Sequence, residues 1–438
     1  MHRFDPAPPE TPTTEQQRDA LQKGLGRAKQ WARAGKLADE SLLEACLEDQ
    51  RHDTQLEETR AEWLWGMVQE AGAAERFRAP ILHAVQRLDD ERSACQLVQL
   101  AFYYAKGGDE AFLARLREIV EAKPSPEELW LAEGEIIELD GWDGFLLAAK
   151  SRGRRLASQE WEWSDNSFIE DAIEQFGEAE VTRCLDETDD PDLIRFRETW
   201  RDQIALNPEE EGSYEEMMRA RPVEKILSIA RTEEDHPVWF SGWGRYADEV
   251  DLEKLREHLW FSEDPRVIKN LLPVFFKVPL QNIDRRWFDL CRHPDSLVQH
   301  RAFSVLKNNA HPLIREFAVA ELSALPFIPN VVGLFIKNYQ RGDEAKILEA
   351  IELPDEVNAL HWLLRDVIEL LEQNEEADRL PLALLTYTET PCENCRYYAV
   401  KLLLGQNLAP EWLIEECHFD SCTRTVELIE ALDPNASE

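Results

Sequence analysis

The cysteines and one histidine near the C-terminus are the residues of this chain whose types and spacing could hold a metal ion. Cys392 and Cys395 form a Cys-x-x-Cys pair, and the chain later places Cys417, His418 and Cys422 close together. Thiolate and imidazole groups are the usual ligands of structural zinc sites. Cys417 and Cys422 are five residues apart, however, which suits joint ligation from one regular helix poorly. Because buried cysteines often act as small apolar residues, the sequence favours ordinary packing and predicts no metal and no other cofactor, with zinc as the alternative.

Two tryptophan-rich segments could supply anchors for a partner, because aromatic and arginine side chains dominate many protein interfaces. The first segment, residues 161–165, interleaves tryptophan with acidic residues. The second segment, residues 236–246, places aromatic residues beside Gly242 and Gly244. These glycines disfavour a continuous helix, so we expect a loop or a broken helix that joins two blocks. The alternative is that the rings fill the joint as core. The candidate partner-binding residues are Trp161, Trp163, Trp239, Phe240, Trp243 and Arg245.

Few residues are arranged as catalytic groups usually are. His236 follows two acidic residues and could take part in acid–base chemistry, but no serine or cysteine partner is identifiable, and a charged turn explains it. Residues 140–144 combine two aspartates with glycines, yet lack the ligand series of a calcium loop. The sequence has no phosphate-binding glycine loop and no Gly-x-Ser-x-Gly elbow. We therefore expect a protein that is not an enzyme.

The elements that must position these residues begin with a recurring pattern. Residues 190–195 and 264–269 share Asp-Pro, an apolar pair and a basic residue, and residues 311–315 carry a shortened form that starts with histidine. Aspartate is a favourable N-cap, and proline suits the first helical position. A second pattern, Arg-x-aromatic-small-Val, recurs loosely at 301–305, 315–319 and 396–400. Repeated helix-start chemistry predicts a chain built by stacking one helical hairpin many times.

These patterns resemble the HEAT family, including its short prokaryotic form that is related to phycobilin-lyase repeats. The resemblance is best over residues 260–325, weaker over 185–200 and 390–430, and limited to hydrophobic periodicity before about residue 180. It implies an all-α fold, an α-solenoid of stacked antiparallel helix pairs that forms a HEAT-like superhelix. Families of this kind are mostly protein-binding scaffolds.

The sequence divides into four expected parts. Residues 1–17, rich in proline and threonine, predict a flexible tail rather than a signal peptide. Residues 18–235 predict a degenerate, acidic helical block, 236–250 a tryptophan-rich joint, and 251–438 the HEAT-like block. The sequence contains no stretch of about 18 uncharged apolar residues, so we expect no membrane span. Eight cysteines in 438 residues fit reduced thiols, so we expect a cytoplasmic protein of bacterial type.

The net charge of −38 is unevenly distributed. Residues 101–250 carry 37 acidic and 17 basic side chains, a net charge of −20, and residues 351–438 carry a net charge of −14. Residues 251–350, with a net charge of +1, are a neutral island between these acidic arms. Such fields repel nucleic-acid phosphates and attract basic partners. The alternative is a solvated acidic surface that serves solubility.

Three functions follow as expectations. The first is a non-enzymatic scaffold or adaptor for a protein with basic patches, and the second is an inhibitor or immunity protein that masks a basic nuclease or toxin. The third is an enzyme of HEAT-like fold, of the DNA glycosylase or lyase class. A glycosylase needs a basic groove, and the acidic arms argue against binding of duplex nucleic acid. The basic residues that could line such a groove are Arg285, Arg286, Arg292, Arg301 and Arg315.

Overall fold

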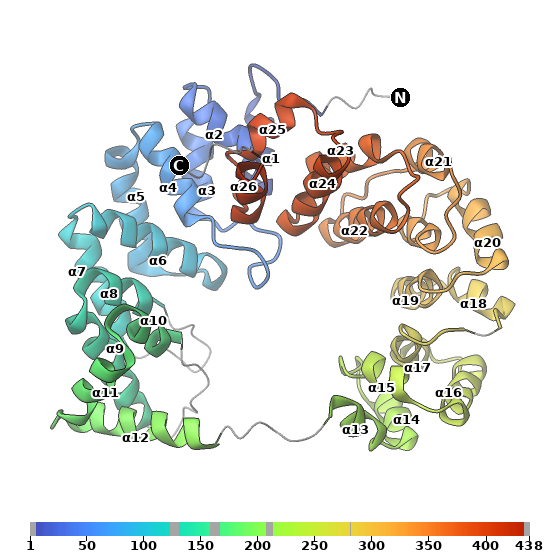
Figure 1. The fold of residues 1–438 in the computed structure, drawn as a ribbon, viewed down its shortest axis with the longest axis horizontal. Helices are drawn as coiled ribbons and strands as arrows, with labels where there is room; N and C mark the ends of the chain where they lie inside the picture. Colours follow the sequence, from blue (N-terminus) through green and yellow to red (C-terminus); the bar gives the residue numbers. More distant parts are fainter. Residues whose placement is uncertain (1–5, 123–130, 158–166, 207–212, 281, 433–438) are drawn as a thin grey trace. The chain divides into compact units, whose positions relative to one another are not determined.

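The computed structural model describes residues 6–122, 131–157, 167–206, 213–280 and 282–432, and every regular element within these ranges is a helix (Figure 1). The predicted all-α class is therefore confirmed, whereas the regular superhelix stays a prediction. None of the described helices is both long and apolar enough to cross a membrane.

The chain folds into two compact units whose boundaries differ from the predicted blocks. Pro8–Glu210 and Glu415–Glu438 form one unit, which we call the terminal unit. Glu211–Ile414, together with Met1–Ala7, forms the other, which we call the central unit. The predicted joint at 236–250 lies inside the central unit, and the predicted block 251–438 is divided near its end.

The terminal unit is built from helices at both ends of the sequence. Its helices are α1 (Thr14–Lys23), α2 (Gly26–Arg33), α3 (Asp39–Leu47), α4 (Ala61–Glu70), α5 (Ala74–Arg87), α6 (Glu91–Lys106), α7 (Glu110–Glu121), α8 (Glu133–Asp140), α9 (Trp142–Leu156), α10 (Ser167–Phe176), α11 (Glu178–Asp186), α12 (Pro191–Leu206) and α26 (Thr423–Glu430).

The central unit contains α-helices and two 3-10 helices. Its elements are α13 (Tyr214–Arg219), α14 (Val223–Thr232), α15 (Phe240–Tyr246), α16 (Glu249–Phe261), α17 (Pro265–Leu271), η1 (Leu272–Phe275), α18 (Arg285–Leu290), α19 (Ser296–Lys307), α20 (Pro312–Leu322), η2 (Pro329–Phe335), α21 (Asp343–Ala350), α22 (Val357–Gln373), α23 (Arg379–Glu389) and α24 (Glu393–Gly405). Helix α25 (Glu411–Cys417) crosses the boundary between the units.

The recurring Asp-Pro pattern starts helices as predicted. Asp190, Asp264 and His311 precede α12, α17 and α20, whose first residue is a proline in each case. Each of the three side chains accepts a hydrogen bond from the backbone N–H two residues later, at 2.9, 2.9 and 3.2 Å. The same chemistry appears at the start of the chain. Thr13 and Gln16 form a capping box at α1, so the end of the predicted flexible tail is helical.

Helices of the terminal unit pack in two rows. Helices α4, α6, α8 and α10 contact one another in that order, and α5, α7 and α9 form the second row. Fully buried rings such as those of Phe112 and Phe145 lie between neighbouring helices. Because of this alternation, α4, α6, α8 and α10 lie side by side in one row, although other helices separate them in the sequence.

The C-terminal segment of the described chain, residues 415–432, packs against the first helices of the terminal unit (Figure 1). The backbone N–H of Ser421 donates to the carbonyl of Gly24 at 3.0 Å. Arg27 forms a buried ion pair with Glu416 at 2.8 Å. The indole of Trp63 is buried beneath the segment, and its N–H donates to a backbone carbonyl there at 2.8 Å. This segment belongs to the predicted HEAT-like block 251–438, and its packing against the N-terminal helices is not part of that prediction.

Within the tryptophan-rich joint, Phe240–Tyr246 form a short helix, α15, and the residues on either side of it, 236–239 and 247–248, are not helical. Its two glycines allow close packing, because a Cβ atom on Gly242 would overlap the hydroxyl of Tyr214, and one on Gly244 would overlap the carbonyl of Val274. The packing gained by this close approach outweighs the low helix propensity of glycine. The two glycines therefore lie inside a helix, and the break in this segment falls after them, at residues 247–248.

Candidate functional site, an acidic groove

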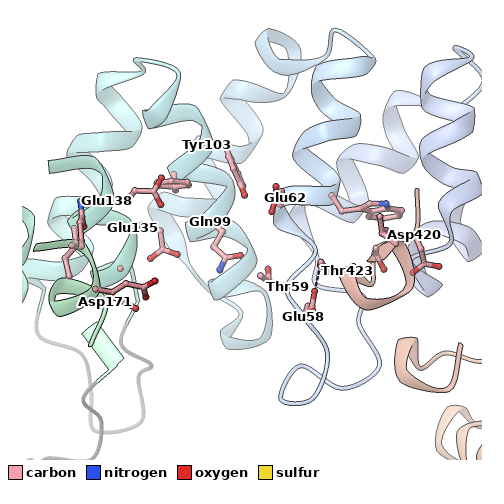
Figure 2. A pocket seen from close by; sticks show the side chains of 18 of the residues that line it. Glu58, Thr59, Glu62, Gln99, Tyr103, Glu135, Glu138, Asp171, Asp420 and Thr423 are labelled. Carbon is pink, nitrogen blue, oxygen red and sulfur yellow. Dashed lines mark hydrogen bonds between the residues drawn. The ribbon is translucent and has the colours of Figure 1, made fainter. Parts of the chain in front are cut away.

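A groove of about 990 Å³ runs along the terminal unit (Figure 2). Its lining residues come from α2, from α4 and the loop before it, from α6, α8 and α10, and from the C-terminal segment. The row of alternate helices thus supplies one continuous wall, and residues 420–426 supply the end. The carboxylates that line the groove are Glu58, Glu62, Glu135, Glu138, Asp171, Glu174 and Asp420.

These seven carboxylates face a single basic residue in the lining, Lys29. At the rim, Lys106 pairs with Glu138 at 2.7 Å, and both side chains are more than half exposed. Within the part of the chain that the structure describes, Glu62, Glu135 and Glu174 form no ion pair. The groove therefore holds a surplus of negative charge that the described residues do not neutralise.

Aromatic side chains lie among the carboxylates. Trp63 and Phe102 contribute buried rings, and the half-buried ring of Tyr103 stacks on Trp65 with 5.9 Å between the ring centroids. Lys106 forms a cation–π contact with one of these rings, because its Nζ lies 5.2 Å from the centroid of Phe102. A cation over an aromatic face is stabilised by the ring quadrupole. The groove therefore combines the two features that hold arginine and lysine side chains.

The electrostatic environment of the groove favours cations. Burial raises the pKa of the Glu135 carboxyl, and the nearby carboxylates of Asp171 and Glu138 raise it further. Burial also raises the pKa of the Tyr103 hydroxyl to about 12, and Glu62 and Glu138 add to the shift. In both cases neighbouring negative charge disfavours another anion. A positively charged ligand in the groove would relieve this repulsion.

The predicted aromatic anchors of the central unit lie mostly inside it. Phe240 and Trp243 are buried, and the Trp243 indole N–H donates to the carbonyl of Arg221 at 2.9 Å. Trp239 is half-buried, with the Arg221 guanidinium 4.0 Å from its ring centroid, and Arg245 is exposed. As placed, Phe240 and Trp243 are core residues, which is the alternative that the sequence analysis raised. Contact with a partner stays a prediction for Trp239 and Arg245.

The other predicted anchors, Trp161 and Trp163, lie outside the described residues. The acidic groove itself was not predicted as a site. The signal that pointed toward it was the net charge of −20 over residues 101–250. The net charge did not indicate which residues line the groove, because the lining also includes residues from α4 and from the C-terminal segment.

The structure separates the five zinc candidates into two groups. Cys392 and Cys395 lie in the central unit, where they meet His361 of α22, a residue that the sequence analysis did not single out. Cys417, His418 and Cys422 belong to the terminal unit, where both cysteines are buried. None of the eight cysteines, all of which lie among the described residues, forms a disulfide.

The arginines that could have formed a basic groove are mostly paired with acidic side chains. Arg286 pairs with Asp284, Arg292 with Glu321, Arg301 with Asp235 and Arg315 with Asp343. Arg285 is exposed. The pairing neutralises the positive charge that duplex binding would require. Asp235 also accepts a hydrogen bond from the backbone N–H of His236, in agreement with the charged turn.

No protein-family model matches this sequence, and comparisons with curated proteins and with solved structures found no match.

Proposed function

We propose that the protein is a non-enzymatic binding scaffold or adaptor whose acidic groove receives a basic segment of a partner protein. The observation that carries this proposal is the composition of the groove, which is lined by seven carboxylates, three aromatic side chains and one lysine, with a second lysine, Lys106, at the rim. Charge complementarity of this kind steers association and selects partners. The repeated helix starts and the resemblance to HEAT repeats also support a scaffold role.

The chemistry of the partner segment follows from the lining. Lysine or arginine side chains fit the carboxylates of Glu62, Glu135 and Glu174, and an arginine can also stack on an aromatic face. Apolar residues between the basic ones would contact Tyr103, whose half-buried ring lines the groove. The expected ligand is therefore a segment in which basic and apolar residues alternate, rather than a uniformly charged polymer.

An inhibitor or immunity protein remains the second candidate, because the same groove could mask a basic face of a nuclease or toxin. It differs from the first in the consequence of binding, which is loss of the partner's activity. Enzymatic action on DNA has less support, because the described arginines of residues 251–350 are largely paired with carboxylates.

Calorimetric titration with synthetic peptides tests the proposed function. The probe is a peptide of alternating lysine or arginine and leucine, and its control replaces each basic residue with glutamate. We expect the basic peptide to bind the full chain, with an affinity that falls as salt screens the charges, and the acidic peptide not to bind. Equal affinity for both peptides would contradict the proposal.

Matched variants locate the binding to the groove. Glu62→Gln combined with Glu135→Gln removes two unpaired groove carboxylates, and Glu75→Gln combined with Glu121→Gln removes two exposed carboxylates of α5 and α7. Both pairs change the net charge equally. We expect at least a roughly tenfold loss of affinity for the first pair, about 1.4 kcal/mol, and little change for the second. A similar loss for both pairs would indicate a general charge effect and would overturn the assignment to the groove.

A further inference from the structure

A second site lies in the central unit, at the start of helix α24. The Sγ atoms of Cys392 and Cys395 and a ring nitrogen of His361 all lie within 4.8 Å of one another. The distance from the Cys395 Sγ to the His361 Nδ1 is 4.0 Å. We propose that these three residues bind a zinc ion.

The distances are close to those that zinc requires. Zinc–sulfur bonds of about 2.3 Å and zinc–nitrogen bonds of about 2.0–2.1 Å in a tetrahedral site place the ligand atoms roughly 3.6–3.8 Å from one another. The spacing of the ligand atoms, at most 4.8 Å, exceeds this range by no more than about 1.2 Å. Small rotations of the side chains are therefore enough to close the site around an ion.

The backbone holds the two cysteines in place. Cys392 is the N-cap residue of α24, and Cys395 lies in the first turn, so the Cys-x-x-Cys spacing directs both sulfurs to one end of the helix. The fully buried Thr390 fixes the preceding loop, because its hydroxyl accepts a hydrogen bond from the Cys392 N–H at 3.2 Å. Helix α22, which carries His361, packs against α24. All three ligands thus belong to rigid elements of one unit.

The surroundings of the sulfurs favour a bound cation. Cys392 and Cys395 are 5% and 6% exposed, so two thiolates there would repel each other with little help from water. A zinc ion bound between the two sulfurs would offset this repulsion.

The ligand atoms indicate which metal would bind and whether the site is of the structural or the open kind. Two thiolates and an imidazole suit zinc, whereas magnesium and calcium prefer oxygen ligands. Among the described residues, no fourth histidine, cysteine, aspartate or glutamate joins the cluster. Three protein ligands leave one coordination position for water or for another ligand, an arrangement that differs from a closed structural site.

Metal analysis of the full chain, purified without a polyhistidine tag and with its thiols reduced, tests the assignment. We expect one zinc ion per chain after equilibration with zinc and removal of the free metal. Cobalt replacement should produce the visible absorption of a tetrahedral site together with sulfur-to-cobalt charge transfer. Reduced wild-type protein that binds neither metal would overturn the proposal, and so would a Cys392–Cys395 disulfide that resists reduction.

Variants identify the ligands. Cys392→Ser, Cys395→Ser and His361→Ala should each weaken zinc binding by at least about 100-fold, since loss of even a supporting residue costs about 10–100-fold. Cys184→Ser, which alters a half-buried cysteine in the terminal unit, should bind zinc as the wild type does. His361→Cys should retain the metal, with stronger sulfur-to-cobalt absorption, and this variant remains informative if another fails to fold. Unchanged cobalt spectra in folded Cys392→Ser and Cys395→Ser would contradict the site.

Discussion

Trp243 shows how one side chain can be read in two ways from the sequence. Its aromatic ring and its position beside glycines fitted a binding anchor, and equally a core residue. The structure buries the ring to 2% exposure and satisfies its N–H with the Arg221 carbonyl. The neighbouring Trp239 keeps part of its surface exposed, so the two tryptophans differ in burial.

We predict that Trp243→Ala destabilises the protein by about 3–5 kcal/mol, because it removes a large buried side chain and leaves a cavity. Trp239→Ala should cost clearly less. Urea unfolding, followed by circular dichroism, measures both. A Trp243→Ala variant as stable as the wild type would return this residue to the list of partner-binding candidates.

Glu135 reports on the charge of the groove through its raised pKa. A carboxyl whose pKa is higher in the folded state binds its proton more tightly there, so its ionisation at higher pH lowers the stability of the fold. We predict that Glu135→Gln raises the melting temperature at pH 7. The difference should disappear below about pH 4, where Glu135 is protonated in the folded and unfolded states alike. A variant that melts below the wild type at pH 7 would contradict the described repulsion.

A basic ligand should also release a proton from this residue. Positive charge near Glu135 favours the carboxylate and lowers its pKa, so binding at about pH 5 should release protons into the buffer. Titrations in buffers with different heats of ionisation measure this release. It should be smaller in Glu135→Gln, and a release of equal size would assign the proton to another group.

At the level of elements, the helix starts were predictable because their chemistry is local. The Asp-Pro and His-Pro pairs cap α12, α17 and α20 as expected, since capping needs contacts with the next few residues alone. Helix α15 was missed because its glycines serve contacts with Tyr214 and Val274, and these lie elsewhere in the sequence. Helix propensity describes an isolated segment, whereas in the folded protein the close packing of these glycines stabilises the helix.

The role assigned to Gly244 can be tested directly. A methyl group at this position would overlap the Val274 carbonyl, whereas one at Gly405, near the end of α24, meets no atom within 4 Å. We predict that Gly244→Ala destabilises the protein by about 1–3 kcal/mol through overpacking. Gly405→Ala should be neutral or stabilise the protein by up to about 1 kcal/mol. Thermal unfolding distinguishes the two, and equal effects would contradict the packing argument.

At the level of the whole chain, the two ends of the sequence build one unit. Contacts between residues 415–432 and the first helices join segments separated by several hundred positions, such as Arg27 and Glu416. No local pattern encodes such a pairing. The sequence therefore predicted the helical class and a surplus of acidic residues over 101–250, but it could not predict which segments assemble the groove. His361 was missed for the same reason, because it meets Cys392 and Cys395 through packing.

The Arg27–Glu416 ion pair should matter for the stability of the terminal unit. Its side chains are 10% and 0% exposed, so loss of the arginine leaves a buried carboxylate without this partner. We predict that Arg27→Met costs about 3–5 kcal/mol. The exposed pair Arg183–Glu180 serves as a control, since Arg183→Met should change the stability little. Comparable losses in the two variants would mean that the buried pair does not hold the C-terminal segment in place.

The measurement that tests the central claim most directly is hydrogen–deuterium exchange of the full chain with and without the basic peptide, read by mass spectrometry. The acidic groove predicts protection in α4, α6, α8, α10 and residues 420–426, which line it. The acidic control peptide should protect none of these segments. Protection confined to the central unit, or no protection at peptide concentrations that saturate binding, would contradict the groove as the binding surface.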